Sequence, residues 1–162
     1  SPYAFTKSKN LQLLNYLNKW FGLSYEALYF YNVYGSGHIK EGPMATVVGI
    51  FERQYEKKIP LTVVSPGTQS RKFTHINDTV KGCYFAWKKN KGRHYSLSNT
   101  KSYTIKQLAK LFTSNIKIIP SKLGERKRSS IVKKVGKIKI HTFPCKISLK
   151  SYVDEFKANL SI

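Results

Sequence analysis

The 162-residue sequence predicts an α/β fold in which strands and helices alternate along the chain. Three observations lead to this expectation. Apolar side chains recur at helical spacing in several segments, short apolar runs rich in β-branched residues lie between them, and turn residues separate the two. No apolar run approaches the roughly 20 residues of a membrane-spanning helix, so no membrane association is expected.

The first half of the chain is expected to contain four elements: a helix at 3–21, a strand at 24–31, a helix at 44–58 and a strand at 61–64. In the first helix Leu13, Leu17 and Trp20 recur at three- and four-residue spacing, and Gly22 is a suitable stop. The turn Ser65-Pro66-Gly67 closes the second strand.

The second half is expected to contain strands at 71–76, 95–98 and 116–119, alternating with a helix that ends near Lys89, a helix after residue 104 and a final helix after Ser148. Asn77 or Asp78 would cap the first of these helices. Its inward face would hold Val80, Cys83, Tyr84 and Trp87. Thr104 and Gln107 form a capping box. The basic, weakly patterned stretch 122–139 is expected to form a long loop.

The chain is strongly basic, with 29 Lys and Arg residues against 8 Asp and Glu and a net charge of +21. Such a charge suits nucleic acid or an anionic membrane surface. However, only five of the cations are Arg, the side chain suited to forked recognition of phosphates and bases, and the Lys residues are spread along the chain. A nucleic-acid role is therefore disfavoured, although a basic nucleic-acid-binding module without catalysis stays as an alternative.

The two cysteines, Cys83 and Cys145, are far apart in sequence and match neither a disulfide framework nor a thiolate metal site. The four histidines have no metal-ligand spacing. We therefore expect a reduced, cytoplasmic setting and no metal.

Tyr3 and Lys7 are four residues apart, so on a helix their side chains project from one face. An ammonium beside a phenol favours the phenolate, which makes a usable general base. Asn32 follows the carboxyl end of an expected strand, and ligands bind at such ends in open α/β sheets. These residues are the first candidates for a functional site.

The segment SPYAFTK, followed in order by FYNVYG, GTQSRKF, THIND and LGER, resembles the NAD-dependent epimerase/dehydratase family, the extended short-chain dehydrogenases/reductases. The resemblance runs from Ser1 to about Ala158. It implies that residues 1–35 are the C-terminal remnant of a Rossmann-type domain, carrying the Tyr-x-x-x-Lys helix and the following strand. Residues 36–162 would form a small mixed α/β domain that binds a nucleotide sugar.

The implied function is the C-terminal, substrate-binding part of an NAD-dependent nucleotide-sugar epimerase, similar to UDP-glucose 4-epimerase. A nucleotide-sugar dehydratase or reductase of the same family is an alternative. The resemblance implies that Tyr3 exchanges a proton with a sugar hydroxyl, and that Lys7 binds the nicotinamide ribose of NAD. Asn32 and Arg71 would contact the diphosphate of the nucleotide sugar, and Lys122 would stand in for a second diphosphate-binding Arg.

Several positions depart from the family pattern. Tyr29 stands where an Arg is common, Lys72 where an Asp is common, and Val64 where an aromatic often stacks on the nucleobase. Ser65-Pro66 replaces the usual Gly-Asp, and a Lys at 122 cannot make the forked contact of Arg. The resemblance still implies the diphosphate contacts, whereas these departures leave the identity of the base open. Asp78 matches a family Asp, although a helix cap explains it more simply.

The sequence contains no Gly-x-Gly-x-x-Gly. We therefore expect the chain to be the back part of a larger enzyme whose NAD site lies mostly in a preceding half. The resemblance implies that the full-length enzyme is a homodimer with the helix at 3–21 in its interface. Alone, the chain is expected neither to bind NAD tightly nor to turn over substrate. The helix at 3–21 is expected to expose an apolar patch and to promote self-association.

Overall fold

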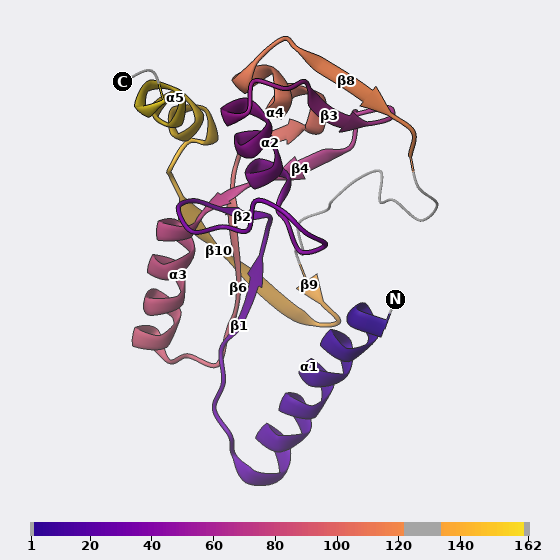
Figure 1. Ribbon diagram of the computed structural model, residues 1–162. Coiled ribbons are helices and arrows are strands. Elements are labelled where there is room, and N and C mark those ends of the chain that lie inside the picture. Colours follow the sequence, from indigo (N-terminus) through magenta and orange to yellow (C-terminus); the bar gives the residue numbers. More distant parts are fainter. Residues whose placement is uncertain (1, 122–133, 161–162) are drawn as a thin grey trace.

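The computed structural model describes residues 2–121 and 134–160, and it has the alternating α/β architecture that the sequence predicts (Figure 1). The helices are α1 (Pro2–Phe21), α2 (Val47–Glu56), α3 (Ile76–Lys89), α4 (Ile105–Phe112) and α5 (Leu149–Asn159). The strands are β1 (Ala27–Phe30), β2 (Val33–Tyr34), β3 (Leu61–Val64), β4 (Ser70–Lys72), β5 (Thr74–His75), β6 (His94–Asn99), β7 (Ser102–Thr104), β8 (Ile116–Ile119), β9 (Lys134–Val135) and β10 (Ile138–Cys145).

Within the described parts of the chain, the largest sheet has four strands in the order β1-β6-β10-β9. Strands β1 and β10 both run parallel to β6, with Leu28 and His141 in register with Tyr95 on either side of it. The central strand β6 is buried from His94 to Ser98, because a parallel central strand is covered on both faces. The sheet joins β1 to strands beyond residue 36, so it crosses the expected domain boundary, and the division into two domains stays a prediction.

Helix α3 packs on this sheet through small residues, which corrects the face expected from the sequence. Thr79, Gly82 and Ala86 are buried, whereas Val80, Tyr84 and Trp87 are exposed and Cys83 is only half-buried. A Cβ placed on Gly82 would lie 2.7 Å from the Cδ2 atom of Leu97 on β6. The helix and the sheet approach so closely that large side chains are excluded from the contact. The spacing of apolar residues along the sequence does not reveal this close approach.

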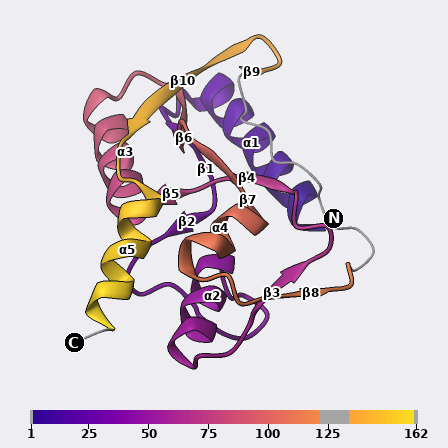
Figure 2. The same ribbon diagram turned by 90° about the horizontal axis from the view of Figure 1, so that it is seen from above.

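Helix α1 lies apart from the rest of the molecule, on the side of β1 and β6 opposite to α3 (Figures 1 and 2). None of its described residues is buried. Its carboxyl-terminal half is hydrogen-bonded to the connection that leads into β1, from the Tyr25 hydroxyl to Asn15 Oδ1 and from Asn18 Nδ2 to the Leu23 carbonyl (2.8 Å). The expected exposed apolar patch is therefore confirmed, and Leu13, Trp20 and Phe21 belong to it.

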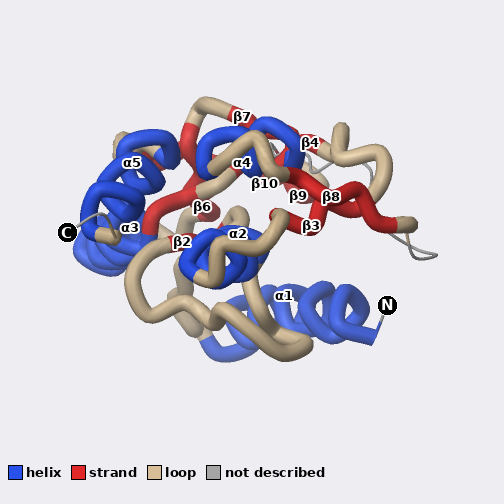
Figure 3. Tube along the Cα trace, turned by 45° about the horizontal axis from the view of Figure 1, so that its top comes forward, coloured by secondary structure: helices blue, strands red, loops and turns tan. Residues whose placement is uncertain are grey.

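A hydrophobic core outside the four-stranded sheet lies among α2, α4, α5 and three pairs of short strands of the described residues. Figure 3 shows these elements gathered together. Strand β3 pairs with β8 in parallel, β4 pairs with β7 antiparallel, and β2 pairs with β5 in parallel. The strand expected at 71–76 is wrong as a single element, because β4 and β5 pair with different partners. The capping box of Thr104 and Gln107 is confirmed.

Strand β10 falls partly in the stretch 122–139 that was expected to be a loop, and its eight residues include Pro144. Residues 122–133 of that stretch lie outside the described residues. Of the described helices, none has both the length and the apolar character needed to cross a bilayer.

Candidate functional site

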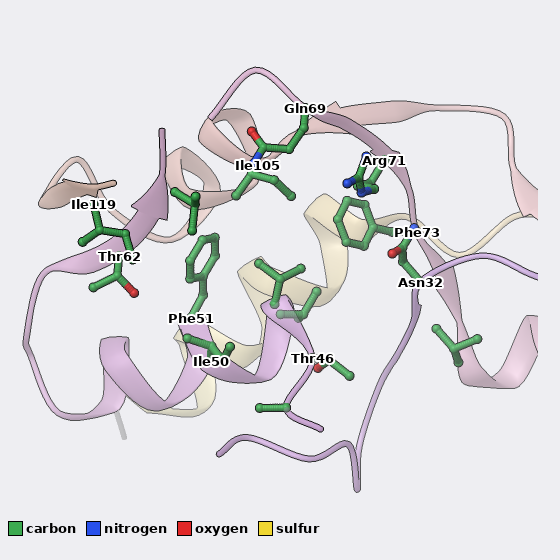
Figure 4. Close-up of a pocket in the computed structure, with 15 residues that line it drawn as sticks. Asn32, Thr46, Ile50, Phe51, Thr62, Gln69, Arg71, Phe73, Ile105 and Ile119 are labelled. Atoms are coloured by element: carbon green, nitrogen blue, oxygen red, sulfur yellow. The ribbon is translucent and has the colours of Figure 1, made fainter. Parts of the chain in front are cut away.

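A cavity of about 560 Å³ lies between α2, the β3–β8 pair, β4 and the first residue of α4 (Figure 4). Much of its wall is apolar, with Phe51, Phe73 and Ile105 contributed by three different segments. A concave, largely apolar space with a few polar groups is the usual form of a small-molecule site. Figure 4 shows Thr62 and Ile119 toward one end of the cavity and Arg71 and Asn32 toward the other.

Arg71 and Asn32 are two of the residues proposed from the sequence, and the structure brings them to the same cavity. Arg71 lies on β4, is half-buried, and donates from Nη1 to the carbonyl of Ser70 (3.1 Å). Asn32 has a left-handed backbone, with φ of 36°, a conformation in which Asn is enriched. Its Nδ2 donates to the carbonyl of Lys72 (2.7 Å), so the amide is fixed beside the strand that carries the guanidinium.

Lys72 follows Arg71 on β4, and successive side chains of a strand point to opposite faces. Its Nζ donates to the carbonyl of Asn99 (3.0 Å) and to that of Thr100, at the carboxyl end of β6. Burial lowers the pKa of this amine. Lys72, which stands where the family pattern commonly has an Asp, therefore joins β4 to the central sheet.

The opposite end of the cavity is held by paired hydrogen bonds between α2 and β3. Gln54 donates from Nε2 to the hydroxyl of Thr62 (2.8 Å), and Gln54 Oε1 accepts from the Thr62 backbone N–H (3.0 Å). Val64 and Ile119 pair across β3 and β8 and both line this end. The aliphatic Val64, in the place of a common aromatic, keeps this end apolar without a ring.

Gln69 also lines the cavity, although the sequence did not single it out. Its Oε1 is buried and has no hydrogen-bond partner among the described residues. Its backbone carbonyl accepts from the N–H of Ile105 (3.2 Å), at the start of α4. The sequence contained one signal for Gln69. It lies two residues before Arg71, so both side chains lie on one side of an extended segment.

The loop from residue 36 to residue 46 borders the cavity through Ala45 and Thr46 and is attached to α2 by a buried carboxylate. Glu52 is 2% exposed, and its oxygens accept from His38 Nε2 (2.8 Å), the Tyr152 hydroxyl (2.8 Å) and Lys40 Nζ (3.2 Å). Burial alone would raise the pKa of Glu52, but these partners outweigh it and the pKa lies below its ordinary value.

Tyr3 and Lys7 lie together on α1, with Lys7 Nζ 5.5 Å from the centroid of the Tyr3 ring. Tyr3 is 71% exposed, and the described residues that line the cavity include none from α1. The structure therefore brings Tyr3 and Lys7 together with each other but not with Arg71. Lys122 lies outside the described residues.

Asp78 joins two segments of the fold and does not cap a helix. The expected cap at Asn77 or Asp78 is wrong, because His75 is the N-cap of α3 and its ring accepts from the Asn77 N–H (3.2 Å). Asp78 is 5% exposed and accepts from the backbone N–H of Ile147 (2.8 Å), just before α5.

Burial, and then the nearby Asp78, raise the pKa of Cys145 to about 11, so that thiol stays neutral. Among the described residues, no group of three His, Cys, Asp or Glu side chains could hold a metal.

Comparison with known proteins gives a consistent assignment. The model of the "NAD dependent epimerase/dehydratase family" matches residues 1–98. An uncharacterized UDP-glucose epimerase of Bacillus subtilis is 35% identical over 82 residues, which cover 51% of this chain and 25% of that protein. A UDP-glucuronate 4-epimerase of Thermodesulfobacterium geofontis is 35% identical over 83 residues, which cover 51% of this chain and 24% of that protein.

The fold is also similar to that of a UDP-glucose 4-epimerase from Thermotoga maritima, solved with UDP-glucose. The TM-score is 0.79 at 22% identity, and the match covers 99% of this chain and 54% of the other. The 162 residues thus correspond to about half of that chain, and the sequence matches span about a quarter of the curated relatives.

Proposed function

The chain belongs to the NAD dependent epimerase/dehydratase family, and from that premise we propose that it is the substrate-binding part of a nucleotide-sugar epimerase. The observation that carries the proposal is the position of Arg71 and Asn32 at one end of a largely apolar cavity. A guanidinium can bind two phosphate oxygens at once, and an amide can add a neutral hydrogen bond. The diphosphate would lie at this end, and the nucleoside would extend toward Val64 and Ile119.

The substrate class is proposed on two further grounds. Both curated relatives are described as acting on UDP-sugars, and the similar fold from Thermotoga maritima was solved with UDP-glucose. The family also includes dehydratases, so a nucleotide-sugar dehydratase or reductase is the alternative chemistry. Binding of the diphosphate would be the same in each case, because the reactions differ at the sugar.

We propose Tyr3 as the group that exchanges a proton with a sugar hydroxyl, and Lys7 as the cation beside it. Their adjacency on α1 supports this pairing. NAD, where bound, would supply the chemistry of hydride exchange at the sugar carbon. Tyr3 is exposed, and it lies outside the cavity that Arg71 lines. Because the sequence contains no Gly-x-Gly-x-x-Gly, we propose that most of the NAD site belongs to a part of the protein outside these 162 residues.

The apolar face of α1 is proposed as the contact surface of a homodimer. Trp20 and Phe21 are exposed there although they are large and apolar, and such surfaces usually mark interfaces. The net charge of +21 is the basis of the alternative role in polyanion binding. That role predicts an affinity for RNA that falls steeply with salt and does not depend on Arg71.

Calorimetry with UDP-glucose tests the proposed substrate site. The chain should bind UDP-glucose, Arg71→Ala should weaken binding by at least tenfold, and the exposed Arg93→Ala should bind as the wild type does. An equal loss of affinity in the two Arg variants would indicate nonspecific attraction by the net charge and would contradict a defined binding site at Arg71.

A further inference from the structure

We propose that Gln69 is a specificity-determining residue that accepts a hydrogen bond from a ribose hydroxyl of the bound nucleotide. The inference rests on the proposed function, since it assumes that a nucleoside diphosphate occupies this cavity. Among the described residues, the fold supplies no donor for one buried acceptor in the wall of the cavity. Gln69 Oε1 has no hydrogen-bond partner among the described residues. Such atoms are rare in folded proteins, and a ligand is one way of satisfying them.

The position of Gln69 is fixed, so its side chain is presented to the cavity in a defined way. The Ile105 N–H donates to the Gln69 carbonyl (3.2 Å), and the Lys106 N–H donates to the Gly67 carbonyl (3.0 Å). These bonds join the segment before β4 to the first turn of α4. The same pairing continues along β4, where Ser70 is in register with Thr104 of β7, the residue directly before α4. A residue whose backbone is held in this way can orient an amide with little loss of entropy on binding.

The order of groups along the cavity selects the ribose. Arg71, suited to phosphate, lies two residues beyond Gln69, a separation of about 7 Å along an extended strand. Thr62 and Ile119 lie at the far end, and Figure 4 shows Gln69 at the top of the cavity between these two ends. A nucleotide carries its ribose between base and phosphate. An acceptor at the intermediate position therefore meets the ribose, whose free hydroxyls are its hydrogen-bond donors.

The charges fit this assignment. An amide carbonyl attracts a neutral hydroxyl, whereas a phosphate offers no proton to it near neutral pH. Arg71 supplies the cationic partner for the phosphate, so the two side chains divide the nucleotide between them. A ligand without the hydroxyl would leave the Gln69 acceptor buried and unpaired, and sites of this kind discriminate strongly against such ligands.

The test compares UDP with 2′-deoxy-UDP and 3′-deoxy-UDP on the full 162-residue chain by calorimetry. For the wild type we expect at least one deoxy analogue to bind about tenfold more weakly than UDP. Gln69→Leu should lose about tenfold in UDP affinity and should no longer distinguish that analogue. Gln12→Leu, an equivalent change at an exposed position of α1, should behave as the wild type does.

The stability of the free protein provides the second measurement. Because Gln69→Leu removes an unsatisfied buried acceptor, its midpoint of thermal unfolding without ligand should be equal to that of the wild type or higher. Equal binding of all three nucleotides to the wild type would overturn the role of Gln69 while leaving the proposed function in place. Absence of UDP binding to the wild type would instead overturn the proposed function, and the Gln69 assignment with it.

Discussion

The side-chain amide of Asn32 donates a 2.7 Å hydrogen bond to the carbonyl of Lys72, and so joins the end of β1 to the strand that carries Arg71. The same connection includes a backbone bond from the Thr74 N–H to the Asn32 carbonyl (3.4 Å). Asn32 therefore has a structural partner beside the cavity in addition to its proposed contact with the ligand.

Replacing Asn32 should affect both stability and binding. Asn32→Gly keeps the left-handed backbone but loses the hydrogen bond, which should cost about 1 kcal/mol in the free energy of unfolding. Asn32→Ala should cost about 1 kcal/mol more, because a Cβ disfavours φ of 36°. Urea denaturation measures both changes, and UDP should bind more weakly to each variant. Equal stability of the Gly and Ala variants would contradict the backbone argument.

Glu52 should stabilise the loop beside the cavity in a pH-dependent manner. Its pKa is lowered in the folded chain, so its contribution is fully present above the ordinary value of 4.5 and is lost as the pH falls through the folded pKa. Glu52→Gln should cost about 2 kcal/mol at pH 7, because charge-assisted bonds from His38, Tyr152 and Lys40 are weakened.

The matched control is Glu155→Gln, an exposed carboxylate on α5. Urea denaturation from pH 7 to pH 3 should show that Glu52→Gln loses less stability on acidification than the wild type and the control lose. Parallel pH profiles for all three proteins would show that Glu52 is not a source of the dependence.

Gly82→Ala should destabilise the chain although Ala is the better helix former by about 1 kcal/mol. The new Cβ would approach Leu97 Cδ2 to 2.7 Å and Phe143 Cδ1 to 3.2 Å within the packed contact of α3 and the sheet. Overpacking costs about 1–3 kcal/mol, so we expect a net loss of about 1 kcal/mol. Lys81→Ala, an exposed position of the same helix, should be nearly neutral. A gain in thermal stability for Gly82→Ala would contradict the packing described for α3.

Much of the fold could be predicted from local patterns. Helix α1, strands β3 and β8 and the capping box at Thr104 depend on neighbours a few residues away, and the sequence displays those neighbours directly. The inward face of α3 could not be predicted in the same way, because it is set by the close approach of Gly82 to Leu97. Strand β10 was missed for a similar reason. Its pairing with β6 is a long-range contact, and its sequence contains a Pro.

The candidate site was predicted in part. Family motifs pointed to Asn32 and Arg71, and the two line one cavity. Gln69 lies in the same motif as Arg71 but was overlooked, because its unpaired oxygen becomes evident only when the surrounding backbone is in place. The roles of Tyr3 and Lys7 stay predictions, since the described structure places them on an exposed helix face outside the cavity.

The exposed face of α1 should make the chain associate with itself. Trp20 is 65% exposed and Phe21 is 77% exposed, so dimerisation would bury a large apolar area. Size-exclusion chromatography with light scattering should show dimers or larger species for the wild type. The double variant Trp20→Ser, Phe21→Ser should shift them toward monomer, and Met44→Ser, an exposed residue outside α1, should not. A monodisperse wild-type monomer would contradict the assignment of this face.

The most direct test of the nucleotide site is the resonance of the Arg71 Nε–H group during titration with UDP, followed by NMR beside that of Arg93. We predict that the Arg71 signal shifts and saturates with UDP while the Arg93 signal does not move, and that uridine, which lacks the diphosphate, leaves Arg71 unshifted. If UDP binds and the Arg71 signal stays in place, the diphosphate lies elsewhere and the proposed site is wrong.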